Sequence, residues 1–319
     1  MRKGFYLLCD LGVSIHGHRI SSSPQHLEHH LHKIGATVRS VYLSEAKRIT
    51  PQTKFDNNAA RFGIWLEESR RDEKYAQRIA DAIMATHTFL SQSIAFDYSS
   101  EVPWTLWIPQ KCLRNNYFLK LSDIERLHDP DWFNKPRLGR YFTGDPNTFN
   151  NKLWNLLPAA MKEDIFEALH FLQASLREFC FSACDLPELI RDRKRQPFSR
   201  VEFVRAEIAA HNSYKAIEAI IGDPSTDDRK LQTKLRDVGM DPNELVGFRV
   251  VRGNLRGKEP LWRHIRFLNH LRDKKVAHGR TNEDRRITYN QILDFQSCAR
   301  FVIWKAMDNA LGTKNIQIQ

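Results

Sequence analysis

The residues of this chain that are best suited to chemistry lie in one short segment, residues 268–280. Within it Arg272 is followed directly by Asp273 and, after four more residues, by His278. Scission of an RNA strand by its own 2′-hydroxyl needs a proton transfer and stabilisation of charge on the phosphorane. Histidine titrates near neutral pH and can move the proton, whereas arginine keeps its charge and grips phosphate with a rigid fork. This chemistry needs no metal ion.

A helix expected over residues 260–278 must position these side chains. On a regular helix, residues six apart differ by about 9 Å in rise and by about 120° in direction. One copy of the pair therefore closes on a single phosphate only if the helix ends or bends at His278, and Gly279 favours an end there. Pairing two copies of the helix across a twofold axis would bring more of these groups together.

The segment resembles the R-polar-x4-H signature of the HEPN superfamily, with Arg272, Asp273 and His278 at its three fixed positions. The resemblance covers residues 200–312 and implies a helical bundle that dimerises, so that two motifs share one composite cleft. It implies an endoribonuclease of the kind found in toxin–antitoxin, abortive-infection and CRISPR-linked antiviral defence systems. It also implies His278 as the acid/base or nucleophile-orienting group, Arg272 as the phosphate ligand, and Asp273 as a residue that positions either of them.

Basic side chains around the motif are expected to bind the RNA. Residues 252–286 hold 11 Lys and Arg against 4 Asp and Glu, and a basic stretch of this kind favours a polyanionic partner. The expected RNA-binding side chains are Lys274, Lys275, Arg280, Arg266 and His211. The alternative interpretation is a solvated basic helix end with a capping histidine, because cations are favoured near a helix C-terminus.

The same spacing occurs a second time, with Arg205 six residues before His211. Here the residue after the arginine is Ala206, and no glycine follows the histidine. We interpret this segment as helix surface or as the lining of a cleft.

The N-terminal region offers a histidine metal site as an alternative. His26, His29 and His30 would face one way on a helix and could bind zinc or nickel. No cysteine or carboxylate spacing completes the site, so we expect neither a metal nor a cofactor. The chain also has no Walker A, G-x-G-x-x-G or G-x-S-x-G motif, so nucleotide hydrolysis, a dinucleotide cofactor and a serine-hydrolase elbow are not supported.

The middle of the chain, residues 100–150, mixes aromatic side chains such as Trp104 and Trp107 with basic ones such as Lys111. Such a mixture could stack and neutralise single-stranded nucleic acid. It suits the core of a small irregular domain equally well, and the frequent prolines and glycines predict loops and short elements here.

Hydrophobic periodicity predicts a mainly α fold: a HEPN-like C-terminal helical bundle with a mostly helical, partly irregular N-terminal region. Residues 4–20 are the best strand candidate, and the pattern is helical from residue 25 onward. Further helices are expected over residues 59–95, as one or two helices, and from Pro158 to Cys184.

Four C-terminal helices have start and stop signals. Ser199 with Glu202 forms a capping box for a helix over residues 200–221. Ser225 or Thr226 is expected to cap the next helix, which ends near Val238. The helix over residues 260–278 follows, and Thr288 starts the last helix, which ends near Leu311 at Gly312.

The domain division expected from these patterns has three parts. Residues 1–150 form an N-terminal domain for targeting or regulation, residues 151–198 a helix and a basic linker, and residues 199–319 the helical domain. The chain has 319 residues, a net charge of +11 and five cysteines without C-x-x-C spacing. The odd cysteine count indicates a reducing compartment, and no apolar run is long enough to span a membrane, so we expect a cytoplasmic protein.

Together these observations predict a metal-independent endoribonuclease that acts as a homodimer in bacterial defence or as a toxin, with an antitoxin or defence-system protein as a further possible partner. The first alternative is a catalytically silent HEPN-like module that binds nucleic acid or protein. The second is a metal-dependent hydrolase that uses the N-terminal histidines.

Overall fold

The computed structural model divides the chain into two units, which are described separately. The first comprises residues 1–84 and 95–158, and the second residues 85–94 and 159–319. The structure describes residues 3–9, 28–44, 61–70, 72–91, 104–114, 118–120, 146–179, 197, 199–224, 227–247, 258–273 and 286–312.

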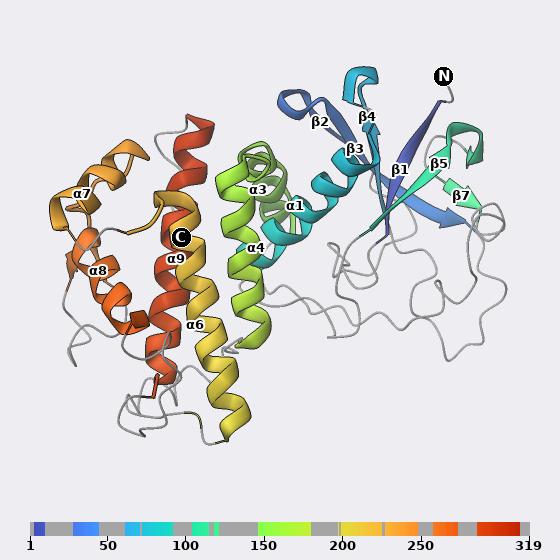
Figure 1. Cartoon of the computed structure of the whole chain (residues 1–319). Helices are drawn as coiled ribbons and strands as arrows, with labels where there is room; N and C mark the ends of the chain where they lie inside the picture. Colours follow the sequence, from blue (N-terminus) through green and yellow to red (C-terminus); the bar gives the residue numbers. More distant parts are fainter. Residues whose placement is uncertain are drawn as a thin grey trace. The chain divides into compact units, whose positions relative to one another are not determined.

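The first unit is built on a mixed β-sheet (Figure 1). Its strands are β1 (Gly4–Cys9), β2 (Glu28–Leu31), β3 (Ala36–Ser44), β4 (Arg61–Leu66), β5 (Trp104–Pro109), β6 (Leu113–Arg114) and β7 (Phe118–Lys120). Among the described residues they are ordered β5-β1-β4-β3-β7-β6, and β2 also pairs with β3. All pairs are antiparallel except β3 with β7.

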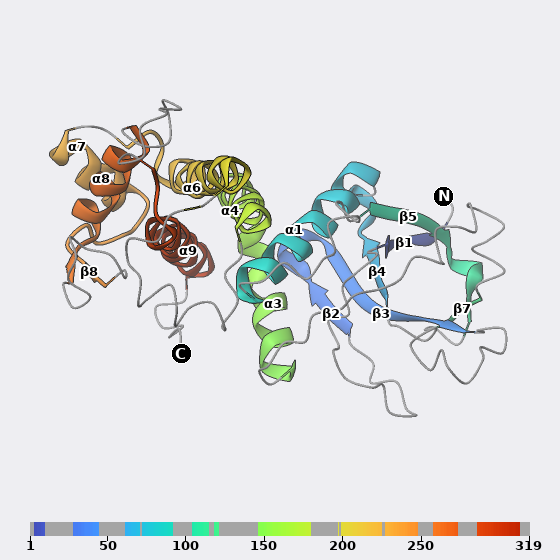
Figure 2. The same cartoon turned by 90° about the horizontal axis from the view of Figure 1, so that it is seen from below.

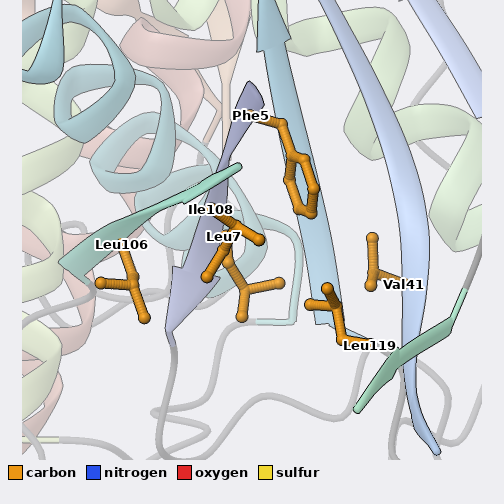
Figure 3. Close-up of a cluster of buried hydrophobic side chains, with 6 residues drawn as sticks. All are labelled: Phe5, Leu7, Val41, Leu106, Ile108 and Leu119. Carbon is orange, nitrogen blue, oxygen red and sulfur yellow. The ribbon is translucent and has the colours of Figure 1, made fainter. Parts of the chain in front are cut away.

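One face of this sheet carries an apolar cluster. The register places Tyr6 opposite Ile64 and Trp107, so the alternate residues of the same strands point to the other face. The side chains on that other face are almost completely buried, and Figure 3 shows them gathered across four strands. They are Phe5, Leu7, Val41, Leu106, Ile108 and Leu119.

Side chains of helices α1 (Glu73–Ser91) and α3 (Pro146–Ala160) contact the sheet or the turn beside it. The hydroxyl of Tyr75 in α1 donates to the carbonyl of Ile34, 2.8 Å away, just before β3. In α3 the ring of Trp154 stacks on His29 and meets Phe62 edge-on, with centroid distances of 5.2 and 5.3 Å. Three 3-10 turns complete the described part of this unit: η1 (His32–Ile34), η2 (Glu68–Arg70) and η3 (Gln110–Cys112).

The prediction of a mostly helical N-terminal region is wrong for the residues that the structure describes there. The 3–4 spacing of Leu27, Leu31 and Ile34 suggested a helix, but β2 and a 3-10 turn occupy residues 28–34, and β3 follows from Ala36. Gly35 takes φ 61°, a left-handed conformation that ends the turn and starts a new strand. The helix expected over residues 59–95 is present only as α1, because the alternating buried residues Phe62, Ile64 and Leu66 belong to β4.

In the second unit, three long helices pack side by side, and Figure 2 views them nearly end-on. These are α4 (Glu163–Glu178), α6 (Arg200–Ile221) and α9 (Tyr289–Leu311). The shorter helices α7 (Asp228–Asp237) and α8 (Leu261–Leu271) pack against each other. A two-stranded ladder of β8 (Leu245–Val246) and β9 (Glu259–Pro260) precedes α8.

The bounds of α6 and α9 confirm the sequence prediction. Ser199 and Glu202 form the expected capping box at the start of α6, and Thr288 forms another with Gln291 at the start of α9. Gly312 ends α9 in the left-handed conformation, φ 70°. These ends could be predicted because each depends on a few adjacent residues.

Other helix limits differ from the prediction. The helix expected from Pro158 is two helices: α3 contains Pro158, and α4 begins after Lys162, where Glu163 and Asp164 provide a favourable acidic first turn. Asp227, rather than Ser225 or Thr226, caps α7 by accepting from two backbone N–H groups. Residues 10–20, 180–184 and 191–196 of the expected strand, helix and linker lie outside the described residues.

The described part of the chain is mostly helical, as expected, and combines these helices with a small, largely antiparallel sheet. None of its helices has the length and the apolar character needed to cross a membrane.

Candidate functional site

Arg272 lies where α8 ends. Leu261, Ile265 and Leu268 recur at spacings of four and three and are fully buried, so they fix one face of α8 in the core. The regular helix stops at Leu271, and Arg272 and Asp273 continue it in a wider π-helical turn. The chain therefore leaves the α-helix at the first residue of the motif.

The guanidinium group of Arg272 is held by three contacts within its own unit. Its Nη1 donates to Glu218 Oε1 on α6 at 2.6 Å. Its Nε and Nη2 donate to Asp273 Oδ1 at 3.1 and 3.0 Å. Its Cζ lies 4.4 Å from the centroid of the buried Tyr214 ring, a cation–π contact. The Arg272 side chain remains 20% exposed.

These contacts also set the charge balance of the cluster. The Nζ of Lys215 lies 2.6 Å from the other oxygen of Glu218, so two cations share one carboxylate. Burial lowers the pKa of Arg272, but the Asp273 hydrogen bond and the charges of Glu218 and Asp273 outweigh it and raise the pKa above its ordinary value. Arg272 is therefore a fixed positive charge at every relevant pH.

His211 belongs to the surroundings of Arg272. It lies on α6, one turn before Tyr214. Its pKa is lowered, first by partial burial and then by the positive charges of Lys215 and Arg272, while Glu218 acts in the opposite direction. The fold therefore brings the histidine of one R-x5-H segment within electrostatic reach of the arginine of the other.

Arg205, the arginine of the second segment, has a different environment. Its Nη2 donates to the carbonyl of Glu178 at 2.9 Å, and its Nε donates to the Glu178 side chain at 3.3 Å. Glu178 is the last residue of α4. Arg205 thus closes the C-terminal end of a neighbouring helix.

The other predicted site residues divide into two groups. His278, Lys274, Lys275 and Arg280 lie outside the described residues. Arg266 is exposed on α8 and forms an ion pair with Asp228 at the start of α7.

The structure does not support the helical arrangement behind the alternative metal site. His29 and His30 lie on strand β2, so their side chains point to opposite faces, and His26 lies outside the described residues. His29 stacks on Trp154, and His30 stacks on His32 at 5.9 Å. Where residues are described, no group of three or more His, Cys, Asp or Glu side chains could hold a metal ion.

The aromatic–basic mixture of the middle region is described only in part. Trp107 lies on β5 and meets the Tyr6 ring edge-on at 4.9 Å, so it packs within the sheet. Residues 121–145, which carry Trp132, Phe133, Tyr141 and Phe142, are outside the described residues.

Sequence reasoning missed Tyr214, Lys215 and Glu218, which form the α6 side of the cluster. They follow His211 at intervals of three, four and seven residues, so they share one face of α6. This polar stripe was visible in the sequence. Its link to Arg272 was not, because Glu218 and Arg272 are 54 residues apart.

Comparisons of the chain with protein-family models, with curated proteins and with solved structures gave no match.

Proposed function

We propose that the second unit is a HEPN-like, metal-independent endoribonuclease. It cleaves RNA by attack of a 2′-hydroxyl on the adjacent phosphate, leaving a 2′,3′-cyclic phosphate and a 5′-hydroxyl. The R-polar-x4-H segment of Arg272, Asp273 and His278 supplies the reacting groups. Two copies of the chain form a composite site.

The observation that carries this proposal is the fixed guanidinium of Arg272 at the end of α8. Three of its five N–H groups are engaged by Glu218 and Asp273, and the Tyr214 ring covers one side of it. The other two N–H groups bond no residue that the structure describes, and we assign them to a phosphate oxygen. A charge that is already oriented costs little reorganisation when the phosphorane forms.

In this proposal Arg272 binds the scissile phosphate, and Asp273 orients the guanidinium. His278 is the acid that protonates the leaving 5′-oxygen, because imidazole titrates near neutral pH. The basic residues Lys274, Lys275 and Arg280 bind neighbouring phosphates of the strand.

The first unit would select the target or regulate cleavage. A nuclease that cuts cellular RNA must be restrained, so a role in bacterial defence or as a toxin in the cytoplasm fits the proposed chemistry. An antitoxin or another defence protein would then bind one of the two units.

Cleavage of labelled single-stranded RNA by the purified full-length chain tests the proposal. We expect the parent to cut in EDTA and to leave 2′,3′-cyclic phosphate ends, which mass spectrometry identifies. His278→Ala should lose about 10²-fold or more in rate, the usual contribution of a general acid. Light scattering should report a dimer.

His270→Ala is the matched control. His270 is an exposed histidine on α8. It lies two residues before Arg272, and residues two apart on a helix do not share a face. This variant should cut at the parental rate. Parental cleavage by His278→Ala would refute the assignment.

A second function, RNA binding without cleavage, is favoured by one specific observation. Glu218 and Asp273 both bond Arg272, so two carboxylates already offset the charge that would stabilise the phosphorane. A silent module would bind RNA with a steep salt dependence and would leave every phosphodiester intact in the same assay.

A further inference from the structure

A continuous polar stripe on α6 extends beyond the contacts with Arg272. Glu207, His211, Tyr214, Lys215 and Glu218 follow one another at spacings of four, three, one and three, so they lie on one face of the helix. Tyr214 and Glu218 both touch Arg272, which shows that this face looks toward the end of α8. His211 lies one turn before Tyr214, a rise of about 4.5 Å along the axis.

His211 is available for chemistry in a way that the buried histidine of α8 is not. His264 is fully buried and its Nδ1 lies 2.9 Å from Glu259 Oε1. His211 is exposed, and it makes no hydrogen bond or ion pair with any residue that the structure describes. Within that part of the chain nothing blocks its ring nitrogens, and one of them can accept a proton from a ligand.

The charges around His211 favour its neutral form. Lys215 on its own helix and Arg272 from the end of α8 both lower its pKa below the ordinary value of 6.5, in addition to the larger effect of burial. Glu218 opposes this, but Arg272 and Lys215 both pair with Glu218 and offset its charge. Glu207, one turn away, has a pKa raised by burial. The imidazole is consequently a base at neutral pH.

We infer that His211 is a second catalytic histidine, the base that takes the proton from the attacking 2′-hydroxyl while Arg272 holds the phosphate. The inference rests on the proposed function and adds a residue from a different helix to the motif. The 2′-oxygen forms its bond to phosphorus as its proton moves to His211. The bond from phosphorus to the 5′-oxygen breaks, and that oxygen takes a proton from the His278 imidazolium.

Two variants of His211 test this inference in the full-length chain with labelled RNA. His211→Ala should lower the rate about 10²-fold, and added imidazole should restore part of it. His211 is an exposed helix residue, so alanine should not disturb folding, which circular dichroism checks. His270→Ala again serves as the histidine control.

The pH profile separates a base from a structural residue. The parental rate should fall as the pH drops through a value below 6.5, because protonation of His211 removes the base. In His211→Gln that acidic limb should disappear, while the alkaline limb due to His278 should stay.

Three outcomes are decisive. Loss of rate and of the acidic limb in the His211 variants, with imidazole rescue, supports the inference. A parent that cuts RNA while His211→Ala cuts equally fast overturns the inference and leaves the proposed function intact. A parent that does not cut RNA overturns both.

Discussion

Two segments of this chain share the same spacing of arginine and histidine and have different surroundings. Arg205 and His211 both lie within α6, whereas Arg272 directly follows the last residue of α8. Both arginines bond a glutamate on another helix, Glu178 in one case and Glu218 in the other. The two glutamates have different neighbours, and this difference separates a structural arginine from a candidate functional one.

The side chains around Arg205 link the ends and sides of α4, α6 and α9 through hydrogen bonds. Arg205 bonds the last carbonyl of α4, and Gln296 on α9 donates to the next one, Phe179, at 2.7 Å. The same amide donates to Ser175, which shares a buried hydrogen bond of 2.8 Å with Ser213 of α6. Carbonyls at a helix end have no partner within the helix, so these side chains satisfy them.

Around Arg272, by contrast, not every buried polar group has a hydrogen-bond partner among the described residues. The hydroxyl of Tyr214, whose ring covers Arg272, is buried and has no hydrogen-bond partner within the described structure. Buried polar groups are normally paired, so exceptions are informative. The spacing alone did not separate the two arginines, whereas the position of Arg272 after α8 and the unpaired Tyr214 hydroxyl beside it do.

The largest effect is expected from removing Arg272. Arg272→Ala should lower the cleavage rate by about 10²- to 10³-fold, comparable to the loss of a group that stabilises transition-state charge. Arg272→Lys should recover only part of the rate, because an ammonium group cannot form the planar fork. Single-turnover cleavage of labelled RNA measures both variants.

Arg205→Lys is the matched control, since it makes the same change in the other segment. It should cut RNA at the parental rate. Equal losses in the two lysine variants would show that the two arginines do not differ in function.

The next largest effect is expected from removing the Gln296 amide, which tests the hydrogen bonds around Arg205. Gln296→Ala leaves the Phe179 carbonyl without this donor and deprives Ser175 of one partner. We expect a loss of about 1 to 3 kcal/mol in the free energy of unfolding, measured by urea denaturation of the full-length chain. Gln291→Ala, at the partly buried start of the same helix, provides a capping control with a loss of about 1 kcal/mol. A Gln296→Ala chain as stable as the parent would contradict the role assigned to this network.

A smaller loss is expected for Arg205→Ala. The pair with Glu178 is partly exposed, 41% and 34% for the two side chains, so solvent weakens it. We expect about 1 kcal/mol of destabilisation and unchanged RNA cleavage. A loss of cleavage without loss of stability would move Arg205 into the functional site and remove the contrast between the segments.

The parts of the fold that followed from the sequence are those fixed by neighbouring residues. The capping boxes at Ser199 and Thr288 gave the limits of α6 and α9. Apart from β1, which lies within the strand candidate of residues 4–20, the strands of the first unit were missed, because they are short and pair over long separations, as β5 does with β1. Apolar residues three and four apart in residues 27–34 imitated a helix, and only the pairing partners distinguish the two cases.

In the candidate site, too, only the residues of one local motif could be predicted from the sequence. Arg272 and Asp273 stand in one local motif, so their types and spacing were enough to select them. Their partners come from α6, and no local pattern indicates which turn of one helix meets the end of another. The stripe from Glu207 to Glu218 could be recognised as polar, but its role depends on the packing of α6 against the end of α8.

The smallest effect is expected for Tyr214→Phe. This change tests the Tyr214 hydroxyl, which has no hydrogen-bond partner in the described structure. The phenyl ring keeps the cation–π contact with Arg272, and the change deletes a buried hydroxyl that has no partner. The free energy of unfolding should stay within about 1 kcal/mol of the parent, on the stabilising side, and RNA cleavage should be unchanged. Tyr214→Leu, which removes the ring, should lower both. A Tyr214→Phe chain that folds normally but no longer cuts RNA would give the hydroxyl a part in the reaction, because packing and the position of Arg272 are retained in that variant.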